Sequence, residues 1–242
     1  MKNKRSTPVW LFDLDNTLHH ASHAIFPAIV AKMNHYIARV LGDGVTPADE
    51  ATVTAARTRW WQRYGATMMG LVNHHDVKPA HFLGETHDFP DLAQMIRAER
   101  GLGQLLRRLP GRKILLTNAP RHYSRAVLRH LRLQRHFTQH IAVEAMRVHG
   151  QLRPKPSKLM LRALMRRHRL TPGRCILVED TLANLRSAKA LGMRTAWITQ
   201  YLRATGSGPA HTHAPARLIR PAYVDVKVKS VRQLPGRLHR LR

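Results

Sequence analysis

Apolar residues recur along this 242-residue chain in two different rhythms, which predict two kinds of structure. Residues 9–12 form a short apolar run of strand length that ends in polar residues. Residues 19–41 then carry apolar side chains at helical spacing, which predicts a helix. The side chains that set this spacing are Ile25, Ile29, Met33, Ile37 and Leu41.

The stretch from residue 20 to about residue 98 is expected to contain several helices and no strand. Thr46 and Pro47 have the character of an N-cap and of the first position of a second helix. Shorter helical segments are expected near 67–75 and 79–84. We therefore expect a helical insert placed directly after the first strand.

From about residue 100, short apolar runs alternate with helical patterns. Strands are expected at 113–116, near 141–143, at 174–178 and at 194–199, and helices at 102–109, from Pro120, from Pro156 and at 182–191. Such alternation is typical of a parallel sheet with helices on both faces.

The predicted fold class is therefore α/β, with residues 1–19 and 99–242 as the core and residues 20–98 as a helical cap domain. Within the core, residues 203–216 are expected to be a loop, in which two histidines give only a weak metal signal. Valines alternate with charged residues at 224–229, which indicates an edge strand. Residues 231–242 are expected to be a basic tail.

The composition adds an extreme positive charge, with 41 Lys and Arg residues, 14 Asp and Glu residues and a formal net charge of +27. Such a field attracts nucleotides, sugar phosphates and nucleic acids. The basic residues are spread along the chain, without zinc-finger spacing or an RNA-binding aromatic motif. We therefore expect mainly a solvated surface, then steering of phosphates, and only weak non-specific binding of nucleic acid, with no specific nucleic-acid partner.

The single cysteine, Cys175, lies in an apolar run and is expected to be a buried thiol. One cysteine cannot form a disulfide within the chain, which fits a reducing compartment, and the expected location is the cytoplasm. No stretch approaches the length of a transmembrane helix, and the apolar run near the start is too short for a signal peptide.

Two carboxylates, Asp13 and Asp15, follow the first strand and precede turn-forming residues. Open α/β sheets bind their ligands at this end of the strands. One carboxylate can attack phosphorus and form an acyl phosphate, and a second can protonate the leaving oxygen and later deprotonate water. The alternative is a strand followed by an ordinary polar turn, and the two acids alone favour neither interpretation.

Three later strand ends carry further polar clusters. Thr117 and Asn118 precede a helix and could cradle a phosphate, although Asn118 could also cap that helix. Lys155 lies between two prolines that restrict its backbone, so its ammonium could be placed against a phosphate, whereas in isolation it could be one more surface lysine. Glu179 and Asp180 follow another strand, and the alternative for Asp180 is an N-cap.

Acids are scarce in this chain, yet four of them, Asp13, Asp15, Glu179 and Asp180, stand at predicted carboxyl ends of strands. A hard cation with oxygen ligands, such as Mg²⁺, would explain the clustering.

The order of these clusters resembles the haloacid dehalogenase-like (HAD) hydrolase superfamily. The matching residues are Asp13-Leu14-Asp15-Asn16-Thr17, Thr117-Asn118, Lys155 and Glu179-Asp180, and the match extends from residue 9 to about residue 200. The resemblance implies a Rossmann-like core with a C1-type cap inserted after the first strand.

The resemblance also implies roles for these residues. Asp13 would be the nucleophile that becomes an aspartyl-phosphate, and Asp15 would be the general acid and base and offer its backbone carbonyl to Mg²⁺. Thr117 and Asn118 would hold phosphoryl oxygens, and Lys155 would orient the nucleophile and the phosphate. Asp13, Asp180 and Glu179 would complete the Mg²⁺ site. One departure is Asn184, which stands where many members carry a further acid, although an amide can still bind Lys155.

A closer resemblance is to the bacterial pyrimidine 5′-nucleotidases. The residues that suggest it are Phe12 to Leu18, Tyr64 to Thr67 with Gly70-Leu71, His87-Asp88, Val178 to Leu185 and Tyr223 to Ser230. This branch implies Mg²⁺-dependent hydrolysis of nucleoside 5′-monophosphates such as UMP and CMP, so the expected partner is a small phosphate monoester.

Other functions compete with this hypothesis. The same core serves phosphatases and mutases that act on a small sugar phosphate or phosphoglycolate, and a more distant alternative is a basic nucleic-acid-binding protein. Dehalogenation is disfavoured because it needs no acid such as Asp15. In the insert, Trp60 and Tyr64 could stack on a base, although their helical spacing also fits core packing.

Overall fold

The computed structural model describes residues 7–202 and 219–241. The chain divides into two compact units, which we call the α/β unit (residues 1–23 and 92–242) and the helical unit (residues 24–91). The sequence placed these boundaries at residues 19/20 and 98/99, and the role of the helical unit as a cap stays a prediction. The loop expected at 203–216 lies outside the described residues.

The α/β unit is built on a six-stranded parallel sheet in the order β3-β2-β1-β6-β7-β8. The strands are β1 (Val9–Phe12), β2 (Arg112–Leu116), β3 (Gln139–Ile141), β6 (Cys175–Glu179), β7 (Arg194–Ile198) and β8 (Val226–Val228). Every residue of β1 and of β6 is buried, because helices cover both faces of a parallel sheet and make its central strands apolar throughout. The predicted α/β class is confirmed, and β8 lies at an edge of the sheet as expected.

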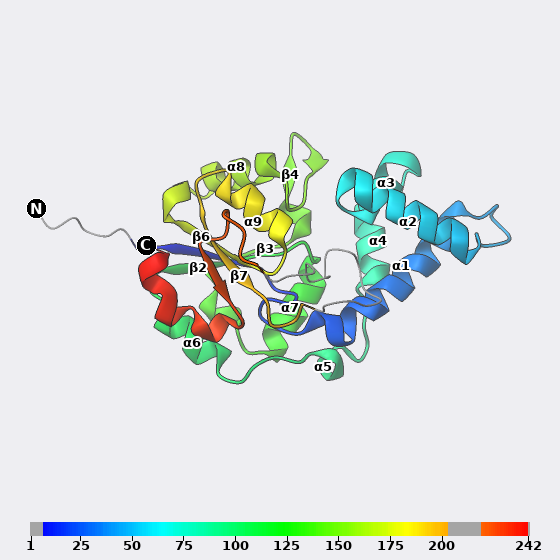
Figure 1. The fold of residues 1–242 in the computed structure, drawn as a ribbon. Helices are drawn as coiled ribbons and strands as arrows, with labels where there is room; N and C mark the ends of the chain where they lie inside the picture. Colours follow the sequence, from blue (N-terminus) through cyan, green and yellow to red (C-terminus); the bar gives the residue numbers. More distant parts are fainter. Residues whose placement is uncertain (1–6, 203–218, 242) are drawn as a thin grey trace, which may run out of the picture. The chain divides into compact units, whose positions relative to one another are not determined.

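Helices cover both faces of this sheet, with α8 and α9 on one face and α6 and α7 on the other (Figure 1). Their bounds are α6 (Leu102–Arg108), α7 (Arg121–His130), α8 (Lys158–Arg167) and α9 (Leu182–Lys189), and α5 (Leu92–Met95) is a single turn. Leu161 of α8 and Leu185 of α9 pack with Leu11, Leu177 and Trp197 of the sheet in one buried cluster. The burial of this apolar surface holds the strands in register and fixes the polar residues that follow them.

Short elements complete the α/β unit. The strands β4 (Arg147–Val148) and β5 (Gln151–Leu152) form an antiparallel hairpin that was not predicted from the sequence. The 3₁₀ turns are η1 (Ala21–His23), η2 (Gln134–His136), η3 (Val143–Ala145), η4 (Pro172–Arg174), η6 (Val231–Gln233) and η7 (Pro235–Arg240). The basic tail is therefore structured as far as residue 241 and ends in turns of 3₁₀ helix.

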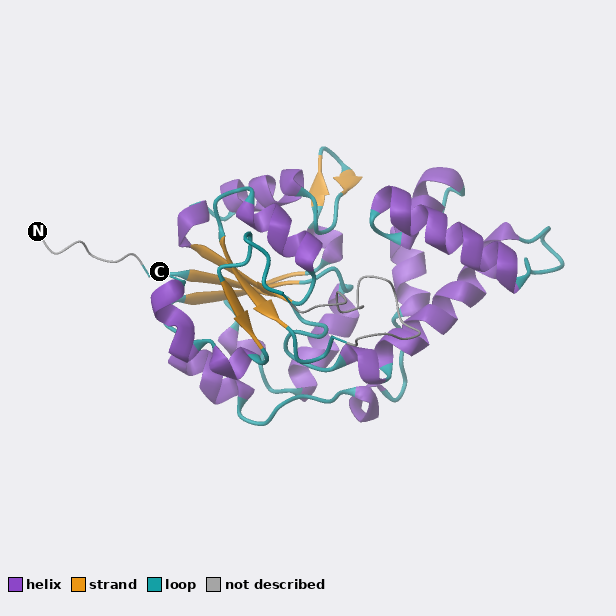
Figure 2. Ribbon diagram, viewed as in Figure 1, coloured by secondary structure: helices purple, strands orange, loops and turns teal. Residues whose placement is uncertain are grey.

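The helical unit consists of helices joined by loops (Figure 2). These are α1 (Ile25–Leu41), α2 (Glu50–Tyr64), α3 (Thr67–His74) and α4 (Pro79–Thr86), and α1 packs against both α2 and α4. The first helix begins at Ile25 and not at residue 19, because a bridge between Asp15 and His19 and the turn η1 intervene.

The start of α2 differs from the prediction that Thr46 caps it. The carboxylate of Asp43 accepts the backbone N–H groups of Val45 (2.9 Å) and Thr46 (2.7 Å), which holds Thr46 in a turn. Asp49 is the N-cap instead, and its side chain accepts the N–H of Thr52 at 2.7 Å.

The helical unit is inserted between two segments of the α/β unit that are bonded to each other. The backbone N–H of His20 donates to the carbonyl of Arg97 at 2.7 Å, so the outgoing and returning chains meet within the α/β unit. Among the residues that the structure describes, no helix is long and apolar enough to cross a membrane.

Candidate active site

The carboxyl ends of β1, β2 and β6 carry six of the predicted site residues, which are Asp13, Asp15, Thr117, Asn118, Glu179 and Asp180. β1 lies between β2 and β6, and Phe12 is in register with both Leu115 and Val178. The residues that follow these three strands therefore lie at the same edge of the sheet. The backbone N–H of Asp13 still donates to the carbonyl of Val178 at 3.0 Å. This arrangement explains why residues distant in sequence share one site.

The turn after Asp13 is fixed by its own polar residues. Asn16 has a φ of 57°, in the left-handed region that asparagine tolerates better than most residues. Its side chain donates to Ser22 Oγ at 2.7 Å and accepts Ser22 N–H at 3.1 Å. The turn therefore holds both Asp13 and Asp15 at the strand end.

The ammonium of Lys155 lies between two buried carboxylates. Its Nζ donates to Asp13 Oδ1 and to Glu179 Oε2, each at 2.7 Å, and its side chain is 2% exposed. Burial by itself lowers the pKa of Lys155, but the two carboxylates outweigh it, so the pKa lies above its ordinary value and the lysine stays charged. Of the two interpretations of Lys155, the placed ammonium is the one that the geometry supports.

Asn118 holds the backbone of this lysine and does not cap α7. Its Nδ2 donates to the Lys155 carbonyl at 3.0 Å, and its Oδ1 accepts the Lys155 N–H at 2.9 Å. The N-cap of α7 is Pro120, without a side-chain bond. Both amide atoms of Asn118 thus position the residue whose ammonium meets Asp13.

Three carboxylates form a buried acidic cluster, which we define as Asp13, Glu179 and Asp180. Each offers an oxygen, and these oxygens lie within 4.8 Å of one another. The pKa of Asp13 is raised to about 7, first by burial and then by the charge of Glu179, while Lys155 opposes the rise. Burial also raises the pKa of Asp180, together with the charges of Glu179 and Asp13.

The acidic cluster fits a divalent cation. One ammonium faces three carboxylates, so a hard cation with oxygen ligands would neutralise the remaining charge. Asp180 is not the N-cap of α9, which is Thr181; instead its Oδ1 accepts the Thr181 hydroxyl at 3.0 Å. The indole N–H of Trp197 donates to the Asp180 carbonyl at 2.8 Å and fixes the backbone there.

Asp15 is held by two residues that the sequence analysis did not single out. Its Oδ1 accepts the Tyr123 hydroxyl at 2.6 Å and lies 2.8 Å from His19 Nε2. Tyr123 is 1% exposed and His19 is fully buried, so water does not compete for these bonds. Burial, followed by the charge of Asp15, raises the pKa of Tyr123 well above its ordinary range, so the phenol stays a hydrogen-bond donor.

The remaining predicted residues have these positions. Thr117 is buried at the end of β2 and its hydroxyl accepts Ala119 N–H at 3.1 Å. Asn184 is buried on α9, but the ammonium of Lys155 donates to the acids and not to this amide.

Trp60 and Tyr64 belong to the helical unit. Trp60 is 2% exposed and packs against the backbone of Gly70. A Cβ at Gly70 would lie 2.0 Å from the indole, so the space beside Trp60 leaves no room for a side chain there. Of the two interpretations of Trp60, this burial favours core packing. Tyr64 is half-buried and its hydroxyl lies 2.7 Å from His74 Nε2.

Comparison with known proteins gives a consistent result. A family model described as "haloacid dehalogenase-like hydrolase" matches residues 9–192. A predicted phosphatase from Clostridium acetobutylicum superposes with a TM-score of 0.63 at 17% identity, over 97% of this chain and 99% of that chain. A HAD phosphatase from Thermococcus onnurineus gives 0.59 at 16% identity, over 96% and 97%. L-2-haloacid dehalogenase from Xanthobacter autotrophicus gives 0.54 at 17% identity, over 97% and 99%.

Proposed function

Because this chain belongs to the haloacid dehalogenase-like hydrolase family, we propose that it is a phosphomonoesterase with Asp13 as its nucleophile. The observation that supports this most is the pairing of two acids with different surroundings on one turn. Asp13 lies beside the ammonium of Lys155 and the other two carboxylates of the acidic cluster, whereas Asp15 lies beside a phenol and an imidazole. Acids in different environments can take different roles in one reaction.

In the proposed reaction, Asp13 attacks the phosphorus of a monoester. Lys155 holds Oδ1, which leaves Oδ2 to form the bond to phosphorus while the ester P–O bond breaks. Asp15 gives its proton to the leaving oxygen and then takes a proton from the water that hydrolyses the aspartyl-phosphate. Tyr123 and His19 keep Asp15 aimed through these two transfers.

The metal in this proposal is Mg²⁺, which Asp13, Glu179 and Asp180 would hold, and the family resemblance adds the backbone carbonyl of Asp15. When bound, it supplies positive charge that offsets repulsion between the carboxylates and the phosphoryl oxygens. Lys155 supplies further positive charge at Asp13. Thr117 and Asn118 lie at the adjacent strand end, and because the Thr117 N–H donates to the Ile141 carbonyl at 3.0 Å, its hydroxyl is the group proposed to donate to a phosphoryl oxygen.

The proposed substrates are nucleoside 5′-monophosphates, with UMP and CMP preferred, and the helical unit is the proposed cap domain. The support is the resemblance of the residues around Asp13, Tyr64 and Glu179 to the pyrimidine 5′-nucleotidases. A small sugar phosphate is the second candidate substrate, because the same site would process it. Dehalogenation, the reaction for which one structural relative is named, is disfavoured because it needs no second acid such as Asp15.

The test is phosphate release from a panel of nucleoside monophosphates and sugar phosphates, with Mg²⁺ and with EDTA. We expect metal-dependent release that favours UMP and CMP, and loss of at least about a thousandfold in kcat for Asp13→Asn. The matched control is Asp49→Asn, because asparagine caps a helix as well as aspartate does. Near-normal turnover by a folded Asp13→Asn protein would refute the proposed nucleophile, and release from sugar phosphates alone would replace the proposed substrate.

A further inference from the structure

All the excess positive charge of the chain belongs to the α/β unit. Residues 1–23 and 92–242 contain 35 Lys and Arg residues and 7 Asp and Glu residues, whereas residues 24–91 contain 6 and 7. Between residues 100 and 178 there are 19 Lys and Arg residues and one acid, Glu144. The charge is therefore a property of the α/β unit, and residues 100–178 carry most of it.

The few acids of the α/β unit are already engaged. Four of them are the site residues described above. Of the others, Asp225 pairs with Lys189, Glu99 accepts the hydroxyl of Ser230, and Glu144 accepts the backbone N–H of Arg121. The arginines of residues 100–178 therefore have no ion-pair partner among the residues that the structure describes.

A cavity of about 280 Å³ opens within this basic region. It lies beside the edge strand β3, and three exposed arginines line it: Arg121 at the start of α7, Arg147 of β4 and Arg167 at the end of α8. Two half-buried histidines, His140 and His168, also line it, and Nε2 of His140 is bonded to the Ser124 hydroxyl at 2.8 Å. No member of the acidic cluster lines this cavity.

The interior of the cavity differs from its rim. Ile141, Met160 and Leu164 form apolar walls, and all three side chains are buried. The side chain of Gln139 also lines the cavity, and its buried Oε1 has no hydrogen-bond partner in the described part of the chain. Because this oxygen exposes less than 1 Å², the Gln139 side chain must turn before it can accept a hydrogen bond from a ligand.

We propose that this cavity is a second ligand site, separate from the acidic cluster, for a small phosphorylated molecule with a flat apolar part, such as a nucleoside phosphate. Arginine is suited to phosphate because its planar fork can donate two parallel hydrogen bonds. Of the three guanidinium groups, that of Arg147 donates to the Gly150 carbonyl at 3.0 Å, and those of Arg121 and Arg167 have no such bond in the described residues. The apolar walls would contact the flat part, and the cavity size suits one small molecule.

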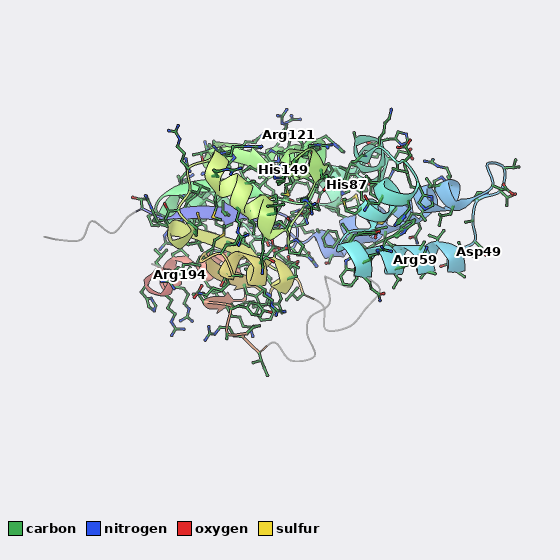
Figure 3. The ribbon with its side chains drawn as sticks, turned by 90° about the horizontal axis from the view of Figure 1, so that it is seen from above. Asp49, Arg59, His87, Arg121, His149 and Arg194 are labelled. Carbon is green, nitrogen blue, oxygen red and sulfur yellow. The ribbon has the colours of Figure 1, made fainter. Side chains whose placement is uncertain are left out.

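The test uses ADP as the probe and calorimetry as the measurement, with EDTA present throughout. Without metal, the carboxylates of the acidic cluster repel phosphate, so binding reports the second site. We expect saturable binding of one ADP per chain, weakened at least about tenfold by Arg121→Gln combined with Arg167→Gln. The control is Arg194→Gln, because Figure 3 shows Arg194 and Arg121 on different sides of the α/β unit, and we expect less than a twofold effect.

A second variant tests the apolar part without changing charge. Ala163 lines the cavity and is half-buried, so Ala163→Phe should fill it and abolish ADP binding while the protein still unfolds cooperatively. Absence of ADP binding to the original protein would overturn the proposal. The proposal would also be overturned if Arg194→Gln weakened ADP binding as much as the cavity variants do. It would be overturned as well if a short mixed RNA bound more tightly than ADP and all variants weakened that RNA binding equally. Either result would indicate unspecific attraction to a basic surface.

Discussion

Replacing Asp180 by asparagine should make the metal-free protein more stable, although it removes a proposed metal ligand. The three acids of the acidic cluster place oxygens within 4.8 Å of one another, and the ammonium of Lys155 is bonded to Asp13 and Glu179. Asp180 accepts the hydroxyl of Thr181 instead, which an amide oxygen can also accept. The substitution therefore removes repulsion and keeps a hydrogen bond.

The size of the effect follows from Coulomb's law. Two carboxylate oxygens 4.8 Å apart repel each other by about 3.5 kcal/mol at an effective dielectric constant of about 20, and oxygens closer than this repel each other more strongly. Ionised Asp180 has two such neighbours, so their repulsion is at least roughly 7 kcal/mol before the attraction of the Lys155 ammonium is counted. Because the raised pKa of Asp180 lets it take up a proton instead, only part of this repulsion is present near neutral pH. We expect a gain of about 2 kcal/mol, or about 4–8 °C in Tm for a chain of this length.

The assay is thermal and urea-induced unfolding, in EDTA and in Mg²⁺. The original protein should be stabilised by Mg²⁺, whereas Asp180→Asn should be more stable in EDTA and respond less to the metal. The matched control is Asp225→Asn, because Asp225 accepts the Lys189 ammonium at 2.5 Å and the Thr195 N–H at 2.9 Å. The same substitution there should lower stability by about 1–3 kcal/mol. An Asp180→Asn protein that is less stable than the original in EDTA would refute the reasoning.

Three further predictions concern the site and the helical unit. Tyr123→Phe removes the 2.6 Å hydrogen bond to Asp15 and should lower kcat about 10–100-fold with little change in KM, as steady-state kinetics would show. Gly70→Ala should cost about 1–3 kcal/mol in urea unfolding, because its Cβ would lie 2.0 Å from Trp60. Its control is Gly84→Ala, where a Cβ meets nothing within 4 Å and a gain of about 0.5–1 kcal/mol is expected. Finally, the pKa of Asp13 is raised to about 7 in the folded protein, so the metal-free protein loses stability as pH rises from about 4 to about 7. Because Mg²⁺ would offset the charge that Asp13 then carries, the increase in Tm caused by Mg²⁺ should be larger at about pH 8 than at about pH 5.

Each of these predictions has an outcome that contradicts it. Unchanged kcat in Tyr123→Phe would mean that the phenol does not position the acid. Equal stability changes in the two glycine variants would mean that the indole yields to a methyl group. A metal effect on Tm that is the same at both pH values would mean that the acidic cluster is ionised throughout that range.

The sheet and the strand-end acids were predictable because their signals are local. The run from Val9 to Phe12 is short, wholly apolar and followed at once by Asp13, so one stretch of sequence gives the strand, its burial and the acid at its end. The same holds for Cys175 to Glu179. Two neighbouring buried strands then require that their carboxyl ends meet at one edge of the sheet.

The partners of these acids could not be predicted, because they depend on packing between distant elements. Tyr123 stands 108 residues after Asp15, and nothing in the helical pattern of α7 distinguishes it from an ordinary core tyrosine. His19 lies four residues after the acid, which suggests contact only in a helix, and this segment is not one. Asn118 had two plausible roles at a helix start, and the structure gives it a third, at the backbone of Lys155.

The hydrogen bond between His20 and Arg97 makes the helical unit an exchangeable module. Since the chain leaves and re-enters the α/β unit at two points that already touch, the sheet does not require residues 24–91 to bring its strands together. A short glycine-rich bridge between residues 23 and 92 is therefore compatible with the same sheet, and so is a different insert at the same place. Residues 24–91 can therefore be replaced as one continuous segment, while the carboxylates and the lysine keep their places on the α/β unit.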